Sequence, residues 1–367
     1  MTNIVILGAG VMGSAFSIPL SDRGYNVKLV GTHLDTDIIE EIHQSRIHPK
    51  LHSHIPDKVT PYTISGLEEA LSGADLLVVA VNSLGVNWAS NQLASLLSAD
   101  VPVLMLTKGL TGDQRKLYIL PDVLRSGLSD DHRDQVKITA VGGPSIAGEL
   151  ASRRHTCVVF SGNDQSLLEK LRNMLKNPYY HIWTSTDLIG IEVCVALKNA
   201  YALGVGLVHG WLEKEGIADN GAVMHNLAAA LFAQGLWETM YLVKYMGGKP
   251  ESAYSLPGAG DLYVTAQGGR NSKMGRFLGL GMKYQEAKAL HMPEETIEGA
   301  ELLLEIGPTI ENLVERGELE GEKLPLLRTL ARIVSRDPSL EIPWDSFFYG
   351  FPSGNRSLEE NKVDWKT

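Results

Sequence analysis

Three glycines near the N-terminus have the spacing of a phosphate-binding turn. They stand in the run Gly8-Ala9-Gly10-Val11-Met12-Gly13, directly after the apolar run Ile4–Leu7. In a nucleotide-binding unit the first glycine makes a tight turn, the second lets the backbone approach a diphosphate, and the third lets a helix pack closely on a strand. The diphosphate would lie against free N–H groups at the positive end of the helix dipole. The motif therefore predicts a dinucleotide site, with a merely structural glycine turn as the alternative.

The residue that would choose between NAD and NADP is not evident in the sequence. An NAD-preferring site usually carries an acid roughly 20 residues past the glycines, at the end of the second strand, where it binds the ribose hydroxyls. This chain has Gly31-Thr32-His33 at that place, with Asp35 slightly too late and no arginine close by for a 2′-phosphate. The sequence therefore does not decide between NAD and NADP.

Two further loops follow strand-like runs and carry groups that could bind a ligand. Thr107-Lys108-Gly109-Leu110 follows the run Val101–Leu106, and Gly142-Gly143-Pro144-Ser145 follows Val136–Val141. Ligands of a doubly wound sheet bind outside the carboxyl ends of its strands, so both loops are predicted to border one crevice. A solvated surface lysine is an equally good interpretation of Lys108, and an ordinary Gly-Pro turn would explain the second loop.

Lys198 stands in the middle of a long apolar stretch, Leu188–Leu207, which predicts a buried helix. Removing an ammonium from water disfavours its charge, so the pKa of such a lysine tends to fall and the amine can exchange a proton near neutral pH. The alternatives are a lysine that snorkels to the surface or pairs with a carboxylate. Because its neighbours are apolar, we favour a functional lysine. Gly204-Val205-Gly206 repeats the glycine spacing in this helix, and close helix packing explains it better than a second nucleotide site.

A glycine-rich stretch later in the chain combines an acid, a hydroxyl and an arginine. It runs Leu256-Pro257-Gly258-Ala259-Gly260-Asp261-Leu262, continues to Thr265, and then reads Gly268-Gly269-Arg270-Asn271-Ser272-Lys273. Asp261 could cap a short helix that begins at Leu262, and Asn271 or Ser272 could cap a helix that begins at Lys273. An arginine and free backbone N–H groups at a helix start also suit a phosphate.

The elements that must position these groups differ between the two halves of the chain. The first half holds five short runs that are apolar on both faces, as strands of a helix-covered parallel sheet are: Ile4–Leu7, Val27–Val30, Leu76–Val81, Val101–Leu106 and Val136–Val141. Two more runs, Thr156–Phe160 and His181–Thr184, are expected at an edge of that sheet. After Thr186 helical patterns dominate, at Leu188–Leu207, Gly221–Met246, Lys273–Leu280, Thr296–Arg316 and Leu324–Ser335.

This change in pattern predicts an α/β domain followed by an all-α domain. Residues 1–186 are expected to form a Rossmann-like domain that binds NAD or NADP. Residues 187–350 are expected to form a helical domain that supplies substrate-binding and catalytic groups. Residues 351–367 are expected to be a polar C-terminal tail.

Composition excludes several other classes of protein. With 33 Lys and Arg against 43 Asp and Glu in 367 residues, the net charge is −10, whereas a nucleic-acid-binding surface normally shows a basic stripe. Cys157 and Cys194 cannot build a disulfide framework and are expected as buried free thiols of a cytoplasmic protein. His48, His52 and His54 are expected in a loop without a metal ion. We find no run that approaches the roughly 20 apolar residues of a membrane span.

Taken together, these stretches resemble the NAD(P)-dependent glycerol-3-phosphate dehydrogenases, the soluble enzymes that reduce dihydroxyacetone phosphate. The resemblance runs from Ile4 to about Leu330, with the motifs in the family's order. Besides the glycine motif, it is carried by Thr107-Lys108-Gly109, Gly143-Pro144-Ser145, Ala196-Leu197-Lys198-Asn199, Gly260-Asp261-Leu262 with Thr265, Arg270-Asn271 and Ile297-Glu298-Gly299. The resemblance implies a Rossmann-like domain and then a helical domain like that of the 6-phosphogluconate dehydrogenases.

The resemblance also implies a role for each group. Lys198 would exchange a proton with the C2 oxygen of the substrate, and the catalytic set would be Lys198, Asp261, Lys108 and Thr265. The substrate, a small phosphorylated molecule, would contact Lys108, Gly143, Ser145, Lys198, Asn199, Asp261, Arg270 and Asn271, with its phosphate chiefly at the last two. NAD or NADP would contact Gly8, Gly10, Val11, Met12, Gly13, Lys108, Ala147, Arg270 and Glu298.

Some positions depart from the family's pattern. Met12 and Gly148 stand where the family usually has a bulky aromatic residue and a lysine, the segment Leu207–Asn226 is longer than usual, and the helix Asn226–Leu231 lacks a basic residue. These departures concern the substrate more than the reaction. The family further implies a homodimer formed through the helical domain. A dehydrogenase of the same build acting on another phosphorylated or carboxylated hydroxy compound is the nearest alternative, and a non-catalytic NAD(H) sensor is a more distant one.

Overall fold

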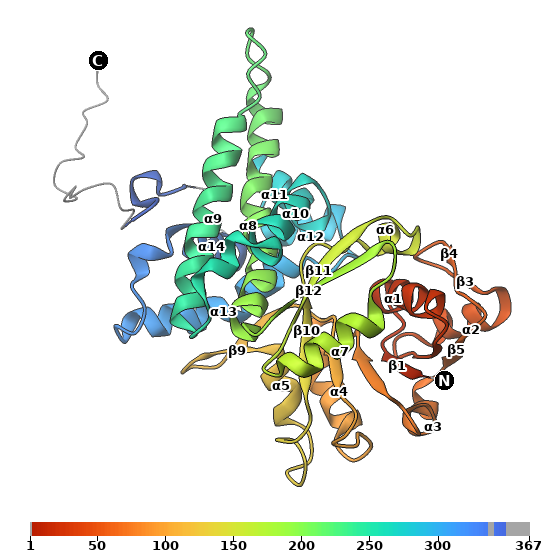
Figure 1. Cartoon of the computed structure of the whole chain (residues 1–367). Helices are drawn as coiled ribbons and strands as arrows, with labels where there is room; N and C mark the ends of the chain where they lie inside the picture. Colours follow the sequence, from red (N-terminus) through yellow and green to blue (C-terminus); the bar gives the residue numbers. More distant parts are fainter. Residues whose placement is uncertain (1, 337–340, 350–367) are drawn as a thin grey trace, which may run out of the picture.

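The computed structural model describes residues 2–336 and 341–349, so the predicted polar tail 351–367 lies outside the described residues. Its first half is built around an eight-stranded sheet with the order β12-β11-β10-β7-β6-β1-β2-β5 (Figure 1). Neighbouring strands pair parallel except β10 and β11, which are antiparallel. The strands are β1 Asn3–Leu7, β2 Asn26–Val30, β5 Val59–Tyr62, β6 Leu76–Val79, β7 Val103–Met105, β10 Ile138–Gly142, β11 Thr156–Ser161 and β12 Tyr180–Ser185.

Strand β1 shows why this sheet is covered on both faces. Val5 and Leu7 belong to one hydrophobic core and Ile4 and Ile6 to another, and all four side chains are fully buried. Successive side chains of a strand point to opposite faces, so a run that is apolar at every position needs helices on both. One face is covered by α1 Val11–Asp22, α2 Thr36–Ser45 and α7 Gln165–Leu175, and the other by α3 Leu67–Leu71, α4 Val86–Leu93 and α5 Leu120–Ser126. A short helix, α6 Ala147–Ala151, packs beside α1.

The strands predicted from the sequence are confirmed, with different ends. Strand β7 is three residues long, and β11 and β12 lie at one edge of the sheet as expected. The opposite edge strand, β5, was not predicted, and it contains Pro61, a residue that only an edge position tolerates well. Two small hairpins were also missed: β3 Ile47–His48 with β4 Ser53–His54, and β8 Leu110–Gly112 with β9 Leu117–Ile119.

The first of these hairpins corrects the loop that the histidines were expected to occupy. His48 lies on β3 and is fully buried, whereas His52 and His54 are exposed. The thiols differ as well, because Cys194 is buried and Cys157 is only half-buried.

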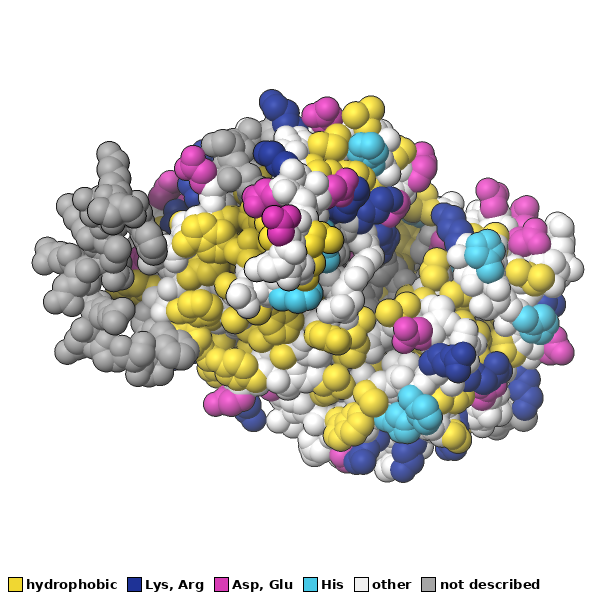
Figure 2. All heavy atoms as spheres, turned by 90° about the horizontal axis from the view of Figure 1, so that it is seen from above, with side chains coloured by type: hydrophobic (Ala, Val, Ile, Leu, Met, Phe, Trp, Pro, Cys, Tyr) yellow, Lys and Arg dark blue, Asp and Glu magenta, His cyan; other side chains and the backbone are white. Residues whose placement is uncertain are grey.

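From Asp187 onward the regular elements of the described chain are helices. They are α8 Leu188–Glu215, α9 His225–Tyr245, α10 Asp261–Gln267, α11 Arg270–Gly279, α12 Tyr284–His291, α13 Glu298–Glu315 and α14 Pro325–Arg336, with a few short turns of 3₁₀ or π helix. Helices α8 and α9 form a hairpin whose tip projects beyond the rest of the molecule (Figure 1). Seen from that end, hydrophobic side chains gather beside the hairpin, and basic and acidic side chains are interspersed over the remaining surface (Figure 2).

Helix α8 is the centre of the helical half. It runs eight residues further than predicted, to Glu215, and nearly all of its first 20 residues are buried. By length and composition it could cross a bilayer, which the sequence analysis did not anticipate, but 89% of its apolar 18-residue window is buried inside the protein. That is the environment of a core helix.

Helices α8 and α11 touch at backbone distance. A Cβ atom added to Gly206 of α8 would overlap the backbone of Ser272, and one added to Gly275 of α11 would overlap the carbonyl of Leu203. The expected close packing at Gly204-Val205-Gly206 is therefore confirmed at Gly206. The contact fixes the start of α11 against the middle of α8.

Candidate active site

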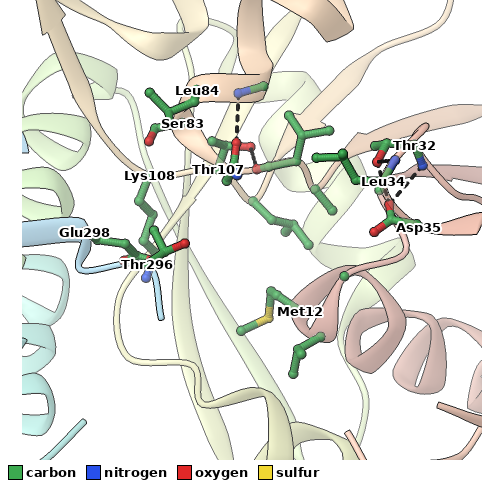
Figure 3. A pocket seen from close by; sticks show the side chains of 18 of the residues that line it. Met12, Thr32, Leu34, Asp35, Ser83, Leu84, Thr107, Lys108, Thr296 and Glu298 are labelled. Atoms are coloured by element: carbon green, nitrogen blue, oxygen red, sulfur yellow. Dashed lines mark hydrogen bonds between the residues drawn. The ribbon is translucent and has the colours of Figure 1, made fainter. Parts of the chain in front are cut away.

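A cavity of about 820 Å³ lies between the sheet and the helical half. It is lined by residues that follow β1, β2, β6, β7 and β10, together with Lys198 of α8, Arg270 of α11 and Glu298 of α13. This is the crevice at the carboxyl ends of the strands where the strand order reverses between β1 and β6, the usual ligand site of a doubly wound sheet. Lys108 and Glu298 stand at one end of the cavity and Asp35 at the other (Figure 3).

The glycine turn fits a dinucleotide diphosphate. Gly8 has a φ of +114°, and a Cβ there would lie 2.8 Å from the carbonyl of Ala80 at the end of β6, so only glycine suits this position. A Cβ on Gly10 would meet nothing within 4 Å, because Gly10 borders open cavity. A Cβ on Gly13 would overlap Gly8, which holds α1 close to the turn. Bare backbone at the N-terminus of α1 therefore faces the cavity.

Asp35 also borders this end of the cavity, although its place in the sequence was slightly too late for the usual pattern. Its Oδ2 accepts hydrogen bonds from the Ala9 N–H at 3.2 Å and from the N–H and hydroxyl of Thr32, both at 2.9 Å. The turn after β2 folds back so that Asp35 bonds Thr32 (Figure 3), and the bond from Ala9 places the carboxylate at the glycine motif. The Thr-x-x-Asp spacing, which lets side chain and backbone bond each other locally, was the signal available in the sequence.

At the other end of the cavity, one buried carboxylate holds two ammonium groups. Oδ1 of Asp261, the first residue of α10, accepts a hydrogen bond from Lys198 Nζ at 2.6 Å. Its Oδ2 accepts from Lys108 Nζ at 2.9 Å, and Lys108 Nζ also donates to the carbonyl of Gly143 at 2.8 Å. The Asp261 side chain is 2% exposed, against 12% for Lys198 and 19% for Lys108. The Asp261 carboxylate lies behind the two lysines, and both lysines line the cavity.

This arrangement shifts the proton affinities of Lys198 and Asp261. Burial lowers the pKa of Lys198 and the nearby Lys108 lowers it further, while Asp261 acts in the opposite sense and only partly offsets them. Burial alone would raise the pKa of Asp261, but the two ammonium groups outweigh burial and hold that pKa below its usual range. The site thus keeps an ionised acid beside an amine that releases its proton more readily than a solvated lysine.

Thr265 completes the environment of Lys198. Its hydroxyl donates to the carbonyl of Asp261 one turn earlier, at 2.7 Å, and accepts from Lys198 Nζ at 2.9 Å. An ammonium has three N–H donors, so these bonds leave one N–H of Lys198 without a partner among the described residues. That N–H belongs to a group that lines the cavity.

Arg270 and Glu298 form the rim of the site. Arg270 Nη2 donates to Glu298 Oε1 at 3.2 Å, and the two side chains are 48% and 47% exposed. Behind them Asn199 donates to Glu298 Oε2 at 2.9 Å and accepts from Asn271 at 3.0 Å, while Asn271 accepts from the N–H of Gly299 at 2.8 Å. These bonds connect α8, α11 and α13 around the cavity.

The two helix caps considered from the sequence are wrong. Helix α10 begins at Asp261 itself, whose carboxylate is held by the lysines rather than by backbone N–H groups. Helix α11 begins at Arg270, and Asn271 lies within its first turn with its amide turned toward Asn199 and Gly299. Tertiary partners replace the local cap in both cases.

Most of the predicted site residues border the same cavity. Those that line it are Gly8, Gly10, Val11, Met12, Lys108, Ser145, Ala147, Lys198, Arg270 and Glu298. Gly13, Gly143, Asp261, Thr265 and Asn271 are not part of its wall, and Asn199 borders a smaller adjoining cavity that shares Lys108 and Glu298 with the first. The structure adds Asp35, which the sequence placed slightly too late, and lining residues that the sequence did not single out: Asn82, Ser83, Leu84, Trp88 and Thr296.

One buried acid near the site was also missed. Glu192 lies on α8, six residues before Lys198, and is fully buried. Neither of its carboxyl oxygens has a hydrogen-bond partner among the described residues. Burial raises its pKa to about 8, opposed in part by Lys108. The signal available in the sequence was the one that indicated Lys198, a charged residue within the apolar run Leu188–Leu207.

Family models match most of the chain. Residues 3–168 match the model of the NAD-dependent glycerol-3-phosphate dehydrogenase N-terminus, and residues 187–342 match the model of the C-terminus of the same enzyme.

Individual proteins agree with these models. The chain is 33% identical over 284 residues to an NADP(+)-dependent glycerol-3-phosphate dehydrogenase of Archaeoglobus fulgidus, covering 77% of this chain and 82% of that one. It is 31% identical to a glycerol-3-phosphate dehydrogenase [NAD(P)+] of Shouchella clausii, covering 85% and 88%. The crystal structure of glycerol-3-phosphate dehydrogenase from Coxiella burnetii is similar with a TM-score of 0.77 at 27% identity, covering 92% of this chain and 96% of that one.

Proposed function

Because the chain belongs to the NAD-dependent glycerol-3-phosphate dehydrogenase family, we propose that it interconverts dihydroxyacetone phosphate and sn-glycerol 3-phosphate with NAD(H) or NADP(H), and that Lys198 is its proton donor and acceptor. The proposed role of Lys198 rests on one observation. The Lys198 ammonium is nearly buried at the cavity wall, Asp261 and Thr265 accept hydrogen bonds from two of its N–H groups, and the third N–H is left for a substrate oxygen.

The proton step follows from that geometry. In the reducing direction Lys198 gives its third proton to the C2 oxygen as negative charge develops there, and in the oxidising direction it takes the proton back. The lowered pKa of Lys198 makes the ammonium a stronger acid than a solvated lysine, and Asp261 opposes that lowering. Asp261 and Thr265 thus hold the amine in place.

The residues at the far end fit the cofactor. Gly8, Gly10 and the N-terminus of α1 would hold the diphosphate, and Asp35 lies on the adenosine side of the cavity. When bound, NADH or NADPH supplies the hydride for the carbonyl carbon. Lys108 and Arg270 would hold the anionic substrate beside Lys198, so three cations are gathered locally in a chain whose net charge is −10.

The proposed division of labour between two domains rests on where the elements and site residues lie in the chain. Residues 1–186 hold the whole eight-stranded sheet and 187–350 supply Lys198, Asp261 and Arg270, which supports a division into a cofactor-binding and a catalytic unit. We also propose a cytoplasmic homodimer. The two free thiols are compatible with a reducing compartment, and the dimer, expected from the family, can be checked by light scattering.

The experiment that tests the function is a steady-state assay of the purified chain with dihydroxyacetone phosphate, run in parallel with NADH and NADPH. We expect turnover with this substrate to exceed turnover with other phosphorylated or carboxylated carbonyl compounds by at least tenfold in kcat/KM. A higher kcat/KM for one of those compounds would identify a same-fold dehydrogenase with another substrate. Binding of the cofactor without turnover on any compound would indicate a nucleotide sensor.

A further inference from the structure

His48 contacts the glycine turn from inside the protein. It lies on β3, is 0% exposed, and its Nε2 is 3.0 Å from the carbonyl oxygen of Ala9. Its other ring nitrogen, Nδ1, accepts hydrogen bonds from the backbone N–H groups of Lys50 at 3.1 Å and Leu51 at 3.0 Å. His48 does not border the cavity.

These contacts define the tautomer of the ring. A nitrogen that accepts two N–H groups cannot carry a proton, so the proton of the neutral imidazole must be on Nε2. Nε2 therefore donates to the Ala9 carbonyl. Burial lowers the pKa of His48 and outweighs the hydrogen bond to Ala9 and the charge of Asp35, which both act to raise it, so the neutral ring is favoured.

Both polar groups of Ala9 are held by side chains. Its carbonyl accepts from His48 and also from the hydroxyl of Ser14 at 3.0 Å, and its N–H donates to Asp35 at 3.2 Å. The carbonyl of Ala9 and the N–H of Gly10 belong to one planar trans peptide, in which they point in opposite directions. With the carbonyl turned inward to His48, the Gly10 N–H is turned outward, where Gly10 borders open cavity.

We propose that His48 is a positioning residue of the cofactor site, which sets the orientation of the Ala9–Gly10 peptide and so presents the Gly10 N–H to the diphosphate. This inference rests on the proposed cofactor, but not on the substrate or on Lys198. A peptide that is free to rotate would have to be ordered when the diphosphate binds, and part of the binding free energy would be lost to that ordering.

Two substitutions separate this role from the local support that His48 gives to its own turn. In His48→Asn the shorter amide can still accept from Lys50 and Leu51 but does not reach Ala9. In His48→Gln the amide nitrogen lies about where Nε2 lies and can donate to Ala9. His54→Asn, at an exposed histidine of the same hairpin, is the matched control.

The readout is the Kd of NADH and of NADPH for the whole purified chain, measured by fluorescence titration, with the Tm of each variant alongside. We expect His48→Asn to raise the Kd of the preferred cofactor about tenfold, His48→Gln to stay within about threefold of wild type, and His54→Asn to leave it unchanged. If His48→Asn does not fold, Ser14→Ala, which removes the other donor to the same carbonyl, should still raise the Kd severalfold.

Wild-type affinity in His48→Asn, in a folded protein, or an equal loss in the Asn and Gln variants would overturn the proposal. A wild-type chain that binds neither NADH nor NADPH would instead contradict the proposed function.

Discussion

Lys198 Nζ and Asp261 Oδ1 are 2.6 Å apart although the two residues are 63 positions apart in the chain. The lysine comes from the middle of α8 and the acid from the first position of α10, so the pair depends on how those two helices pack. Because the same carboxylate also holds Lys108, one residue links the sheet side of the cavity to its helical side.

Replacing Lys198 by alanine is expected to remove the proton donor without disturbing the cofactor end of the cavity. The variant Lys198→Ala should lose at least 10³-fold in kcat, a size typical of general acid–base groups at the upper end of their range. The Kd of NADH, measured by fluorescence, should stay within about threefold. Lys214→Ala, at an exposed lysine of the same helix, is the control. Near-normal kcat in Lys198→Ala would refute the assignment.

The variant Asp261→Asn leaves two ammonium groups without the charge that holds them. The pKa of Lys198 should then fall further, because its main attractive partner is gone. The ammonium form is lost at lower pH, so the alkaline limb of the kcat profile for ketone reduction should move to lower pH, together with a drop in kcat. Breaking a buried charge pair should also cost about 3 kcal/mol of unfolding free energy. An unshifted alkaline limb would contradict the proposed coupling.

Arg270 offers a test of phosphate binding that barely involves stability. The variant Arg270→Ala should raise the KM for dihydroxyacetone phosphate at least tenfold, since a charge-assisted contact to the substrate is lost. Its ion pair with Glu298 is about half exposed, so the free energy of unfolding should change by less than about 1 kcal/mol. Arg276→Ala, on the same helix and paired with Glu213, should leave KM unchanged. Equal KM effects in both variants would show that Arg270 acts only through α11.

Glu192 should make the stability of the protein depend on pH. Its pKa rises from an ordinary value near 4.5 to about 8 in the folded chain. The stabilisation from its bound proton is therefore complete below about pH 4.5 and is lost as the pH rises toward 8. The variant Glu192→Gln has no proton to lose, so its advantage over wild type should grow by about 2–4 kcal/mol between pH 5 and pH 8. Urea unfolding at several pH values measures this difference.

Parallel stability profiles for wild type and Glu192→Gln would mean that Glu192 is stably ionised or solvated in the folded state. The control is Glu215→Gln, at an exposed glutamate at the end of the same helix, which should leave the pH dependence of stability unchanged.

The glycine contact between α8 and α11 predicts a structural defect with a catalytic consequence. Gly206→Ala should cost at least about 2 kcal/mol of unfolding free energy, because its Cβ would overlap backbone atoms that cannot turn aside. Moving α11 should also raise the KM for the phosphorylated substrate. In the control, Gly307→Ala, the Cβ would lie 3.3 Å from a side-chain methyl, and the cost should be small. Equal Tm values for the two variants would contradict the rigid contact.

Much of the fold could be read from the sequence because its elements are locally consistent. The doubly apolar runs of β1 and β6, the glycine turn and the apolar helix α8 each follow from residue type and spacing. The edge strand β5 could not be predicted, since it is short, alternates buried with exposed residues and contains Pro61. The ends of elements also differ from those predicted. Helix α8, for example, continues for eight residues beyond the predicted end at Leu207.

The site residues were harder to predict where their partners are distant in sequence. Nothing near Asp261 in the sequence indicates that lysines 63 and 153 positions away would bond its two oxygens. Local rules allowed only a helix cap, and the family resemblance alone placed Asp261 in the catalytic set with Lys198. His48 was expected in a loop because its neighbours are polar and include Pro49, yet the β3–β4 hairpin places it beneath the glycine turn. Asn271 likewise bonds Asn199 and Gly299, which are distant in sequence, whereas Asp35 combines a local partner, Thr32, with the distant Ala9.

The contact between Arg270 and Glu298 has a consequence for ligand exchange. In the proposed reaction the phosphate of the substrate must compete with a carboxylate that the protein itself keeps on the guanidinium. The phosphate displaces the Glu298 carboxylate from Arg270. The binding free energy gained at Arg270 is therefore only the difference between its contact with the phosphate and its contact with Glu298. Release of the product is helped in the same way, because Glu298 can pair with Arg270 again as the phosphate leaves. In the proposed reaction this ion pair therefore weakens substrate binding and speeds product release.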